Sequence, residues 1–410
     1  MQIIKNNKNR TGAGMLQHFQ SLEAPPARKQ RLTDMFVISA DSHAHEPHDL
    51  WTTRIDSNLR DRVPHVRIDP DGQRWMIMEG FRPGRILEAP RDASALVADF
   101  VTSDALDEDR PRLDRSKGIN FQPHGHADMK RYADLDLDGV NAEILFPNKG
   151  LANWSSPDAV LQAAMCRVYN DWAHEVFGRS TRTFPVACIS PVDTAVAVRE
   201  VERVAAMGFH AVALPPLLHS GGYNLACHEP LWAALAQTGL PVCFHAGTGK
   251  DPRTARGHGG AIINYVVHAM NTVVQPVVEL CASGVFDRHP GLRFVTVEAG
   301  IGWIPYTLWA MDHGHDKHGF WVSPKLKNRP SDYFRQHGHA TFQEDPTGIA
   351  LHDHIGLDSI LWGNDYPHLE GCWPWSDRVA SELKGSLSPA GVAQIMGLNA
   401  ARLFNIPVPT

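Results

Sequence analysis

The most constraining feature of this chain is a regular alternation of short apolar runs and segments of helical periodicity. Beyond residue 140, seven apolar runs have the length and composition of buried strands. They cover residues 142–146, 184–189, 210–214, 241–245, 293–298, 339–342 and 359–362. Helix-period segments lie between most of them, at 157–177, 193–207, 228–238, 262–284 and 303–313. This alternation predicts a parallel sheet whose strands are connected by helices.

One further apolar run, at residues 35–40, raises the number of candidate strands to eight. A closed (β/α)8 barrel needs eight strands. The alternative is an open, doubly wound sheet, but no GxGxxG sequence follows the first run. The 410 residues would suit two or three average domains, yet one barrel with insertions accommodates this length. We therefore predict an α/β fold, a (β/α)8 TIM-type barrel over residues 34–410.

Two regions depart from the barrel pattern. Residues 1–33 are polar and aperiodic, and we interpret them as an arm outside the core, disordered or packed on a partner subunit. Residues 47–133 interrupt the alternation after the first strand. They contain a hairpin signal with its turn at Asp71-Gly72, followed by a stretch rich in charge, Gly and Pro. We predict an insertion of about 47–133 that forms a cap over the barrel mouth.

The overall charge and composition exclude several partners. The formal net charge of −6 argues against non-specific binding to nucleic acid or anionic membranes. No apolar run approaches the ~20 residues of a membrane span. The N-terminal residues lack a secretory h-region, and the six cysteines show no CxxC spacing, as expected for reduced thiols. We expect a cytoplasmic enzyme with a small-molecule substrate, assembled as a homo-oligomer, either a dimer or a tetramer.

Ligand-type residues follow the first predicted strand in the sequence Asp41-Ser-His43-Ala-His45. Alternate residues of an extended strand point to the same side, so two of these three side chains can bind one ion. Aspartate and histidine suit zinc or manganese. Spacing alone allows Asp41 with His43 or His43 with His45. The competing interpretation is a polar loop with unrelated histidines.

Three later strands also end in residues that bear chemistry. His245 ends the run 241–245, Glu298 ends 293–298, and Asp365 follows Trp-Gly-Asn after 359–362. Catalytic groups of barrel enzymes lie where strands meet the following loops. A satisfied core histidine and a loop-fastening salt bridge are the structural alternatives for His245 and Glu298. Four such strand ends in one barrel favour a common site.

Several longer stretches resemble the amidohydrolase superfamily. The sequence is most similar to the branch that contains aminocarboxymuconate semialdehyde decarboxylase and resorcylate decarboxylases, many members of which are labelled only as metal-dependent hydrolases. The matching stretches include ISADSHAHEP at 38–47, DLDGVNAEILFP at 136–147, EPLWAALAQTGLPVCFHAG at 229–247, SGVFDRHPGLRFVTVEAGIGWIP at 283–305 and LWGNDYPHLEG at 361–371. The resemblance extends from about residue 35 to 406.

The resemblance implies a distorted barrel that holds one divalent metal ion, with zinc expected and manganese as the alternative. His245 matches the ligand on the family's fifth strand. Asp365 matches the aspartate on the eighth strand, a ligand and frequent general base. Asp41 and His43 match the first-strand ligand pair, with His45 as the alternative ligand.

The sequence departs from the characterised decarboxylases at Glu298, where those enzymes carry a catalytic histidine. A glutamate donates a proton near neutral pH only when burial raises its pKa. Our leading hypothesis is therefore a metal-dependent hydrolase of a small aromatic or cyclic substrate. The metal lowers the pKa of a bound water towards ~7. Asp365, Glu298 and His245 serve as catalytic residues.

Substrate contacts in this hypothesis come from His368, Trp303 and His268, with the cap shaping specificity. The alternative is a metal-dependent, non-oxidative decarboxylase of an aromatic or unsaturated acid. A third interpretation, from another class, is an inactive barrel that serves as a binding scaffold. The presence of every expected ligand type argues against that third interpretation.

Overall fold

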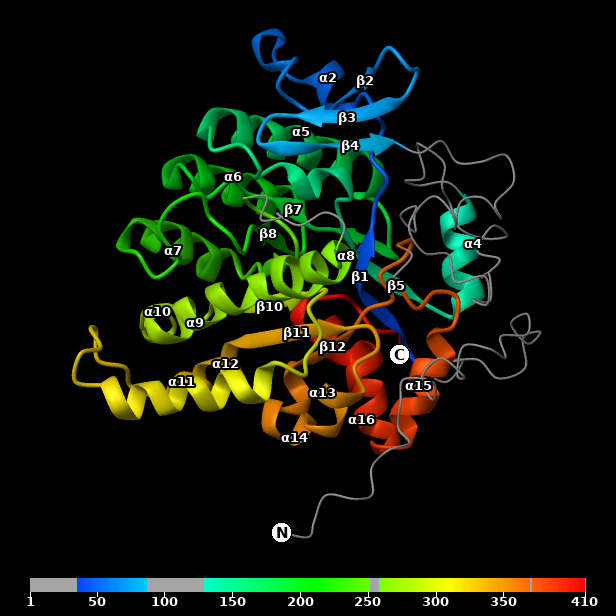
Figure 1. Cartoon of the computed structure of the whole chain (residues 1–410). Helices are drawn as coiled ribbons and strands as arrows, with labels where there is room; N and C mark the ends of the chain where they lie inside the picture. The colour runs from blue at the N-terminus through cyan, green and yellow to red at the C-terminus, as the bar shows by residue number, and fades with distance from the viewer. Residues whose placement is uncertain (1–34, 87–128, 251–257, 369–370, 410) are drawn as a thin grey trace.

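The barrel predicted from the strand count is present in the computed structural model, which describes residues 35–86, 129–250, 258–368 and 371–409 (Figure 1). All barrel strands run parallel. They are β1(Ile38–His43), β5(Ala142–Phe146), β6(Thr183–Pro185), β7(Ala187–Cys188), β8(Val212–Leu214), β9(Val242–His245), β10(Phe294–Val297), β11(Gly338–Phe342) and β12(Ile360–Trp362). Each predicted run is confirmed as a strand, and the run 184–189 is divided into β6 and β7.

Two junctions close the barrel. The strands form one sheet of order β1-β5-β6 and another from β7 to β12. The first junction is the chain itself, because β6 pairs with β5, β7 pairs with β8, and the Val186 N–H donates to the Leu145 carbonyl at 2.9 Å. At the second junction, the His43 N–H donates to the Tyr366 carbonyl at 2.7 Å, and the Asp365 N–H donates to the Asp41 carbonyl at 2.8 Å. The ends of β1 and β12 are therefore held together.

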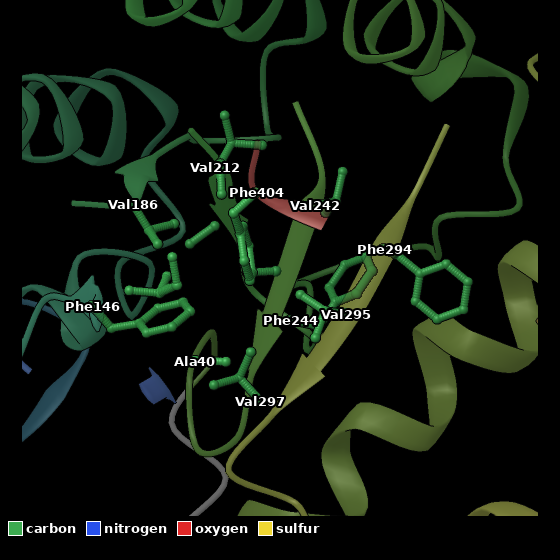
Figure 2. Packing of buried hydrophobic residues seen from close by; sticks show 14 of the residues in the cluster. Ala40, Phe146, Val186, Val212, Val242, Phe244, Phe294, Val295, Val297 and Phe404 are labelled. Atoms are coloured by element: carbon green, nitrogen blue, oxygen red, sulfur yellow. The ribbon is translucent and has the colours of Figure 1, made fainter. Parts of the chain in front are cut away.

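The barrel interior is filled by apolar side chains from almost every strand. Figure 2 shows Ala40, Phe146, Val212, Phe244 and Val297 converging from different strands. Every residue of β1, β5, β9, β10 and β12 is buried. Strands covered on both faces read as continuous apolar runs, which is why the sequence pattern located them.

Helices surround the barrel where the periodicity predicts them. Asp158 and Asp193 accept backbone N–H groups at the starts of α5 and α6, and Gly208 ends α6 with a φ of 87°. The connecting helices are α5(Ala159–Phe177), α6(Thr194–Met207), α7(Glu229–Thr238), α9(Val274–Ala282), α10(Val285–Arg288), α11(Ile304–His318), α12(Pro330–His337), α13(Pro346–Ala350), α14(His352–Ile355), α15(Ser376–Lys384), α16(Pro389–Ala393) and α17(Asn399–Leu403).

The predicted helix 262–284 is not one helix. It consists of α8(Gly260–Ile263), the π-helical turn η5(Asn264–Ala269), the 3-10 turn η6(Met270–Val273) and α9, followed by α10. Pro276 has no N–H to continue the preceding turn and is tolerated in the first turn of a new helix. The apolar spacing located the helical segment but not its interruptions.

The insertion after β1 contains the predicted hairpin and additional elements. Strands β2(His65–Ile68) and β3(Arg74–Met78) pair antiparallel, with Gly72 at a φ of 78° in the connecting turn. A third strand, β4(Phe81–Ile86), completes this sheet, which α2(Leu50–Arg54) precedes. Helix α4(Met129–Asp138) begins inside the predicted insertion and extends beyond its boundary at 133.

The small sheet is fastened to the loop after β5. The Ser155 hydroxyl donates to the Glu79 carbonyl at 3.1 Å, and the Arg62 guanidinium bridges the carboxylates of Glu79 and Asp158. The proposed role as a cap stays a prediction, because residues 87–128 lie outside the described residues. The predicted arm 1–33 lies outside them as well. In the described part of the chain, no helix has both the length and the apolar character needed to cross a membrane.

Closure of the barrel requires a residue without a Cβ at position 363, directly after β12, and Gly363 meets this requirement. A Cβ at this position would lie 2.5 Å from the Asp41 Cβ, and such an overlap forces β1 and β12 apart. We expect Gly363→Ala to destabilise the fold by about 1–3 kcal/mol and to weaken metal binding. Chemical denaturation and metal titration measure the two effects.

Gly391→Ala is the matched control, because its added Cβ would meet the Leu357 side chain at an ordinary 3.4 Å. Equal stability and metal affinity in both variants would contradict the closure argument.

Candidate metal centre and active site

Two histidines from different strands face each other at the barrel mouth. His43 ends β1 and His245 ends β9, both are fully buried, and their Nε2 atoms lie 3.3 Å apart. The Nδ1 of His43 is 2.8 Å from the Pro147 carbonyl, and that of His245 is 2.9 Å from the Ala246 carbonyl. Nδ1–H donation to a carbonyl fixes the ring and leaves Nε2 as the ligand atom, which is the usual arrangement of metal-binding histidines.

Two buried carboxylates surround this histidine pair. Oδ1 of Asp41 lies 3.5 Å from the His43 Nε2 and 3.6 Å from the His245 Nε2, and Oδ1 of Asp365 lies 3.2 Å from the His43 Nε2. Both oxygens of Asp41 and Oδ2 of Asp365 are buried and have no hydrogen-bond donor among the described residues. Uncompensated buried anions are costly, so the cluster requires a cation. The donor set of imidazole nitrogens and carboxylate oxygens fits one divalent ion.

The sequence-predicted ligands come together in two overlapping groups. Asp41, His43 and His245 form one, and His43, Asp365 and His368 form the other. Within each group the ligand atoms lie within 4.8 Å of one another. His45, the alternative first-strand ligand, belongs to neither. It follows the end of β1, is partly buried, and its Nδ1 accepts a hydrogen bond from the Asn148 side-chain amide at 3.0 Å. The geometry therefore favours Asp41 over His45 as the partner of His43.

Glu298 and Asp365 both adopt left-handed backbone conformations, with φ values of 60° and 54°. Such values strain a residue that carries a Cβ and persist where surrounding contacts enforce them, often at functional sites. The Glu298 N–H donates to the Thr341 hydroxyl at 3.0 Å. This turn places Oε2 of Glu298 3.5 Å from the His245 Nε2, while the side chain stays 14% exposed. Glu298 thus lies at the border between the cluster and the open mouth.

The three predicted substrate contacts lie in different environments. The Nδ1–H of His368 donates to the Asp365 Oδ1 at 2.8 Å, and the His368 ring centroid is 4.0 Å from that of His43. Trp303 packs on the small apolar cluster of Ala246, Val273 and Ala299 beside the strand ends. His268 is partly buried in η5 and is a member of neither group of ligand-type atoms among the described residues.

The sequence analysis missed a buried ion pair behind the metal cluster. The Arg131 guanidinium on α4 donates to both oxygens of Glu143 on β5, at 2.6 and 2.7 Å, and both side chains are fully buried. Arg131 also donates to the His43 carbonyl at 3.0 Å and lies 5.1 Å from the centre of the Tyr366 ring. The pair therefore supports the ends of β1 and β12. Glu143, a carboxylate within an apolar strand, was the available signal.

The electrostatics of the cluster favour positive charge. Burial disfavours the charged form of His43, yet the neighbouring carboxylates of Asp365 and Asp41 outweigh burial and raise the pKa of His43 well above 6.5. Burial likewise opposes ionisation of Asp365, but the nearby His368 and His43 lower its pKa below the ordinary value. The carboxylates therefore remain anionic and hold a proton on His43. A divalent ion satisfies the same anions.

The comparisons with known proteins establish the family. The family model described as "Amidohydrolase" matches residues 40–406, and the chain belongs to this family. A gamma-resorcylate decarboxylase of Rhizobium sp. (strain MTP-10005) is 28% identical over 291 residues, which are 66% of this chain and 85% of that protein. Three further curated relatives carry the same name.

Solved structures share the fold. An amidohydrolase from Mycobacterium avium subsp. paratuberculosis K-10 has a TM-score of 0.74 at 23% identity and covers 90% of this chain and 99% of its own. A dihydroxybenzoic acid decarboxylase from Polaromonas sp. JS666, solved with manganese and the inhibitor 2-nitroresorcinol, has a TM-score of 0.59 at 21% identity. It covers 90% of this chain and 97% of its own.

These findings correct the leading functional hypothesis. The chain belongs to the enzyme superfamily that the sequence predicted. Its curated relatives are decarboxylases, however, so the prediction of a hydrolase is wrong. The ligand types did not separate the two reactions, because the same imidazole and carboxylate set holds a divalent ion in either case. The alternative that the sequence left open, decarboxylation, is the better supported one.

The geometry distinguishes the two possible first-strand ligand pairs. We expect His43→Ala to lose metal binding, because the His43 Nε2 lies within 3.5 Å of atoms from Asp41, Asp365 and His245. His45→Ala should retain about one ion per chain. Elemental analysis of the purified variants measures this content. Equal metal content in the two variants would contradict the assignment.

In the metal-free protein, the stability contributed by the cluster should fall as the pH rises. His43 has a raised pKa in the fold, so its proton contributes stability that is complete below pH ~6.5 and is lost as the pH rises through the raised value. A metal ion bound in place of the His43 proton prevents this loss of stability at high pH. We expect the Tm difference between metal-loaded and EDTA-treated protein to widen from pH 6 to about pH 9.

Calorimetry of both forms at each pH measures this difference. Burial raises the pKa of Asp138 to about 6. Because Asp138 titrates in both the metal-loaded and the metal-free protein, its contribution largely cancels in the Tm difference. A Tm difference that narrows with rising pH would show that His43 is not the proton-holding group.

Proposed function

We propose that this protein is a metal-dependent, non-oxidative decarboxylase of a hydroxylated aromatic acid. The observation that carries the proposal is the similarity to gamma-resorcylate decarboxylases over 85% of the length of the Rhizobium relative. The site supports it, because the barrel mouth joins a buried cation site to a partly exposed carboxylate, Glu298, and to the half-buried ring of Trp303. A cation, a proton source and an apolar wall are the parts that such a reaction needs.

We propose that Asp41, His43, His245 and Asp365 hold one manganese ion. Two carboxylates in the set suit a harder ion than a thiolate site would, and a dihydroxybenzoic acid decarboxylase of the same fold was solved with manganese. When bound, the ion supplies positive charge for the carboxylate and the neighbouring hydroxyl oxygen of the substrate. The Nδ1 contacts of His43 and His245 to backbone carbonyls keep both rings in the ligand orientation.

Glu298 is the proposed proton donor. Its carboxyl group lies at the mouth, 3.5 Å from the His245 Nε2, on a turn that the Thr341 hydroxyl holds. In the reaction the ring carbon that bears the carboxylate takes a proton from Glu298. The bond to the carboxylate then breaks, its electron pair restores the aromatic ring, and carbon dioxide leaves. Glu298 regains a proton from solvent, which its partial exposure permits.

His368 and Trp303 are the proposed contacts to the ring. Asp365 fixes the His368 Nδ1 at 2.8 Å, so the imidazole presents a defined edge to the mouth. Trp303 donates its indole N–H to the Gly300 carbonyl at 2.9 Å and has its ring packed beside the turns after His245 and Glu298. An aromatic substrate matches the flat apolar surface that a tryptophan ring provides.

The proposed reaction and the role of Glu298 are tested together. Manganese-loaded protein is incubated with 2,6-dihydroxybenzoate, 5-carboxyvanillate and related hydroxybenzoates, and carbon dioxide and ester or amide hydrolysis products are measured separately. We expect carbon dioxide release, with a ~10²–10⁴-fold fall in turnover for Glu298→Gln at unchanged metal content. Glu298→His should restore part of the activity, because histidine also donates a proton.

Two outcomes would contradict this proposal. Hydrolysis products without carbon dioxide would reject the decarboxylase assignment. Carbon dioxide release with normal turnover in Glu298→Gln would keep the reaction and remove Glu298 as its acid. Gln is the matched replacement because it preserves the shape of the side chain and its backbone turn.

A further inference from the structure

One buried carboxylate near the metal cluster has no part in the function proposed above. Glu46 ends the string Asp41-Ser-His43-Ala-His45-Glu46 and is fully buried. Among the described residues, it belongs to neither group of ligand-type atoms. A buried carboxylate is unfavourable unless hydrogen-bond donors or cations compensate its charge. The groups that donate to Glu46 therefore indicate its role.

Three backbone N–H groups of the loop after β5 donate to the Glu46 carboxylate. Oε1 accepts from Asn148 at 3.0 Å and from Gly150 at 2.9 Å, and Oε2 accepts from Lys149 at 2.9 Å. Hydrogen bonds to an ionised carboxylate are stronger than those between neutral groups. The Lys149 ammonium also donates to the Glu46 carbonyl. Glu46 therefore holds this loop through both its side chain and its backbone.

A glycine in this loop permits the close approach to Glu46. A Cβ on Gly150 would lie 3.1 Å from the Glu46 Oε1 and 2.7 Å from the Pro147 Cβ. A residue with a side chain would therefore push the loop away from the carboxylate, and glycine avoids this overlap. The segment 147–150 is thus shaped to fit around Glu46.

The same loop orients a metal ligand. Its first residue, Pro147, presents its carbonyl to the Nδ1 of His43 at 2.8 Å. Strands β1 and β5 lie side by side (Figure 1), with His43 in register with Phe146, so the carbonyl of the next residue reaches the imidazole. A second-shell partner that orients a ligating histidine is worth ~10–100-fold in metal affinity. The position of the Pro147 carbonyl therefore matters for the ion.

The second ligand histidine is oriented in a different way. The Nδ1 of His245 lies 2.9 Å from the carbonyl of Ala246, the next residue in the chain. The orientation of His245 is therefore local. The orientation of His43 depends instead on a loop more than 100 residues away in the sequence, and that loop is held by Glu46.

We propose that Glu46 is a positioning residue for metal binding, because its carboxylate fixes the segment 147–150 and so keeps the Pro147 carbonyl on the His43 ring. Glu46 does not coordinate the ion itself, since backbone N–H groups occupy both of its oxygens. It acts through the loop on the orientation of His43. This role rests on the metal site and not on the reaction that the site catalyses.

Asp345 provides a matched control, because it holds a different loop in the same way. Its carboxylate accepts the N–H groups of Ile301 and Gly302, both at 2.7 Å, and that of Gly348 at 2.8 Å. The loop that contains Ile301 follows Glu298 and provides no hydrogen bond to a ligand histidine. Variants of Glu46 and Asp345 thus both weaken three N–H contacts, but only the Glu46 variant removes support from His43.

The test is a calorimetric titration of the metal-free full chain with manganese. Glu46→Gln keeps the size of the side chain, but its amide turns an N–H donor towards backbone donors. We expect the manganese Kd of Glu46→Gln to rise ~10–100-fold, and that of Asp345→Asn to stay within ~3-fold of the wild-type value. Chemical denaturation of the metal-free variants measures their general destabilisation, which we expect in both.

Cobalt-substituted protein gives a second readout. The Nδ1–H protons of the ligating His43 and His245 should appear as exchangeable, hyperfine-shifted proton NMR signals. In Glu46→Gln we expect the His43 signal to exchange faster with water and the His245 signal to stay unchanged. A difference between two histidines of one protein separates lost positioning of His43 from a general loosening of the fold.

If Glu46→Gln does not fold, Lys149→Met tests the same contact. Lys149 is only partly buried, and its ammonium holds the Glu46 carbonyl. We expect a smaller rise of the manganese Kd in the same direction. Unchanged affinity in the variant that folds would overturn the proposal.

Two further outcomes would also overturn it. An equal rise of the Kd in Asp345→Asn would show a general effect of loosened loops. A wild-type chain that binds no divalent ion would reject the metal site and the role of Glu46 together. Because metal affinity is measured without a substrate, a failure of the proposed decarboxylation would leave this test intact.

Discussion

The structure depends on a small set of buried charges at the point where the barrel closes. Asp41 lies in β1 and Asp365 follows the neighbouring strand β12, and the Asp365 N–H donates to the Asp41 carbonyl while both carboxylates lie beside His43. Burying two carboxylates in a protein interior is unfavourable unless a cation compensates them. The fold therefore couples barrel closure to cation binding. The proton held by His43 is one cation that meets this requirement, and a divalent ion is the other.

The surroundings of this cluster make the arrangement rigid. Arg131, itself fully buried, joins Glu143 on β5 to the carbonyl of His43 and lies over the Tyr366 ring. A buried guanidinium without a counter-ion is unfavourable. The bidentate pair with Glu143 is therefore what allows Arg131 to be buried at this position. The insertion after β1 thus contributes to the site, because its final helix α4 supports the first-strand ligands through Arg131.

The ligands of the cluster do not by themselves specify a reaction. Imidazole and carboxylate ligands serve water activation and carboxylate binding equally well, so they do not separate the two reactions. The glutamate at position 298 led to the prediction of a hydrolase, and the relatives corrected it. At the position of Glu298, the resemblance to the decarboxylases implies a histidine in those enzymes. The Glu298 backbone has a φ of 60°, and its Oε2 lies 3.5 Å from the His245 Nε2, at the edge of the cluster.

The sequence by itself determined the eight strands, most of the helices and the identity of the strand-end residues, because periodicity and burial on both faces leave a direct record in the order of residues. The division of residues 262–284, the third strand of the insertion and the Arg131–Glu143 pair were decided by tertiary structure, since each depends on contacts between distant segments. Tertiary structure also decided whether Asp41 or His45 is the first-strand partner of His43. Both have the parity of His43, but β1 ends at His43, and only the meeting of β1 with β9 and β12 brings Asp41 to the histidine pair and leaves His45 with Asn148.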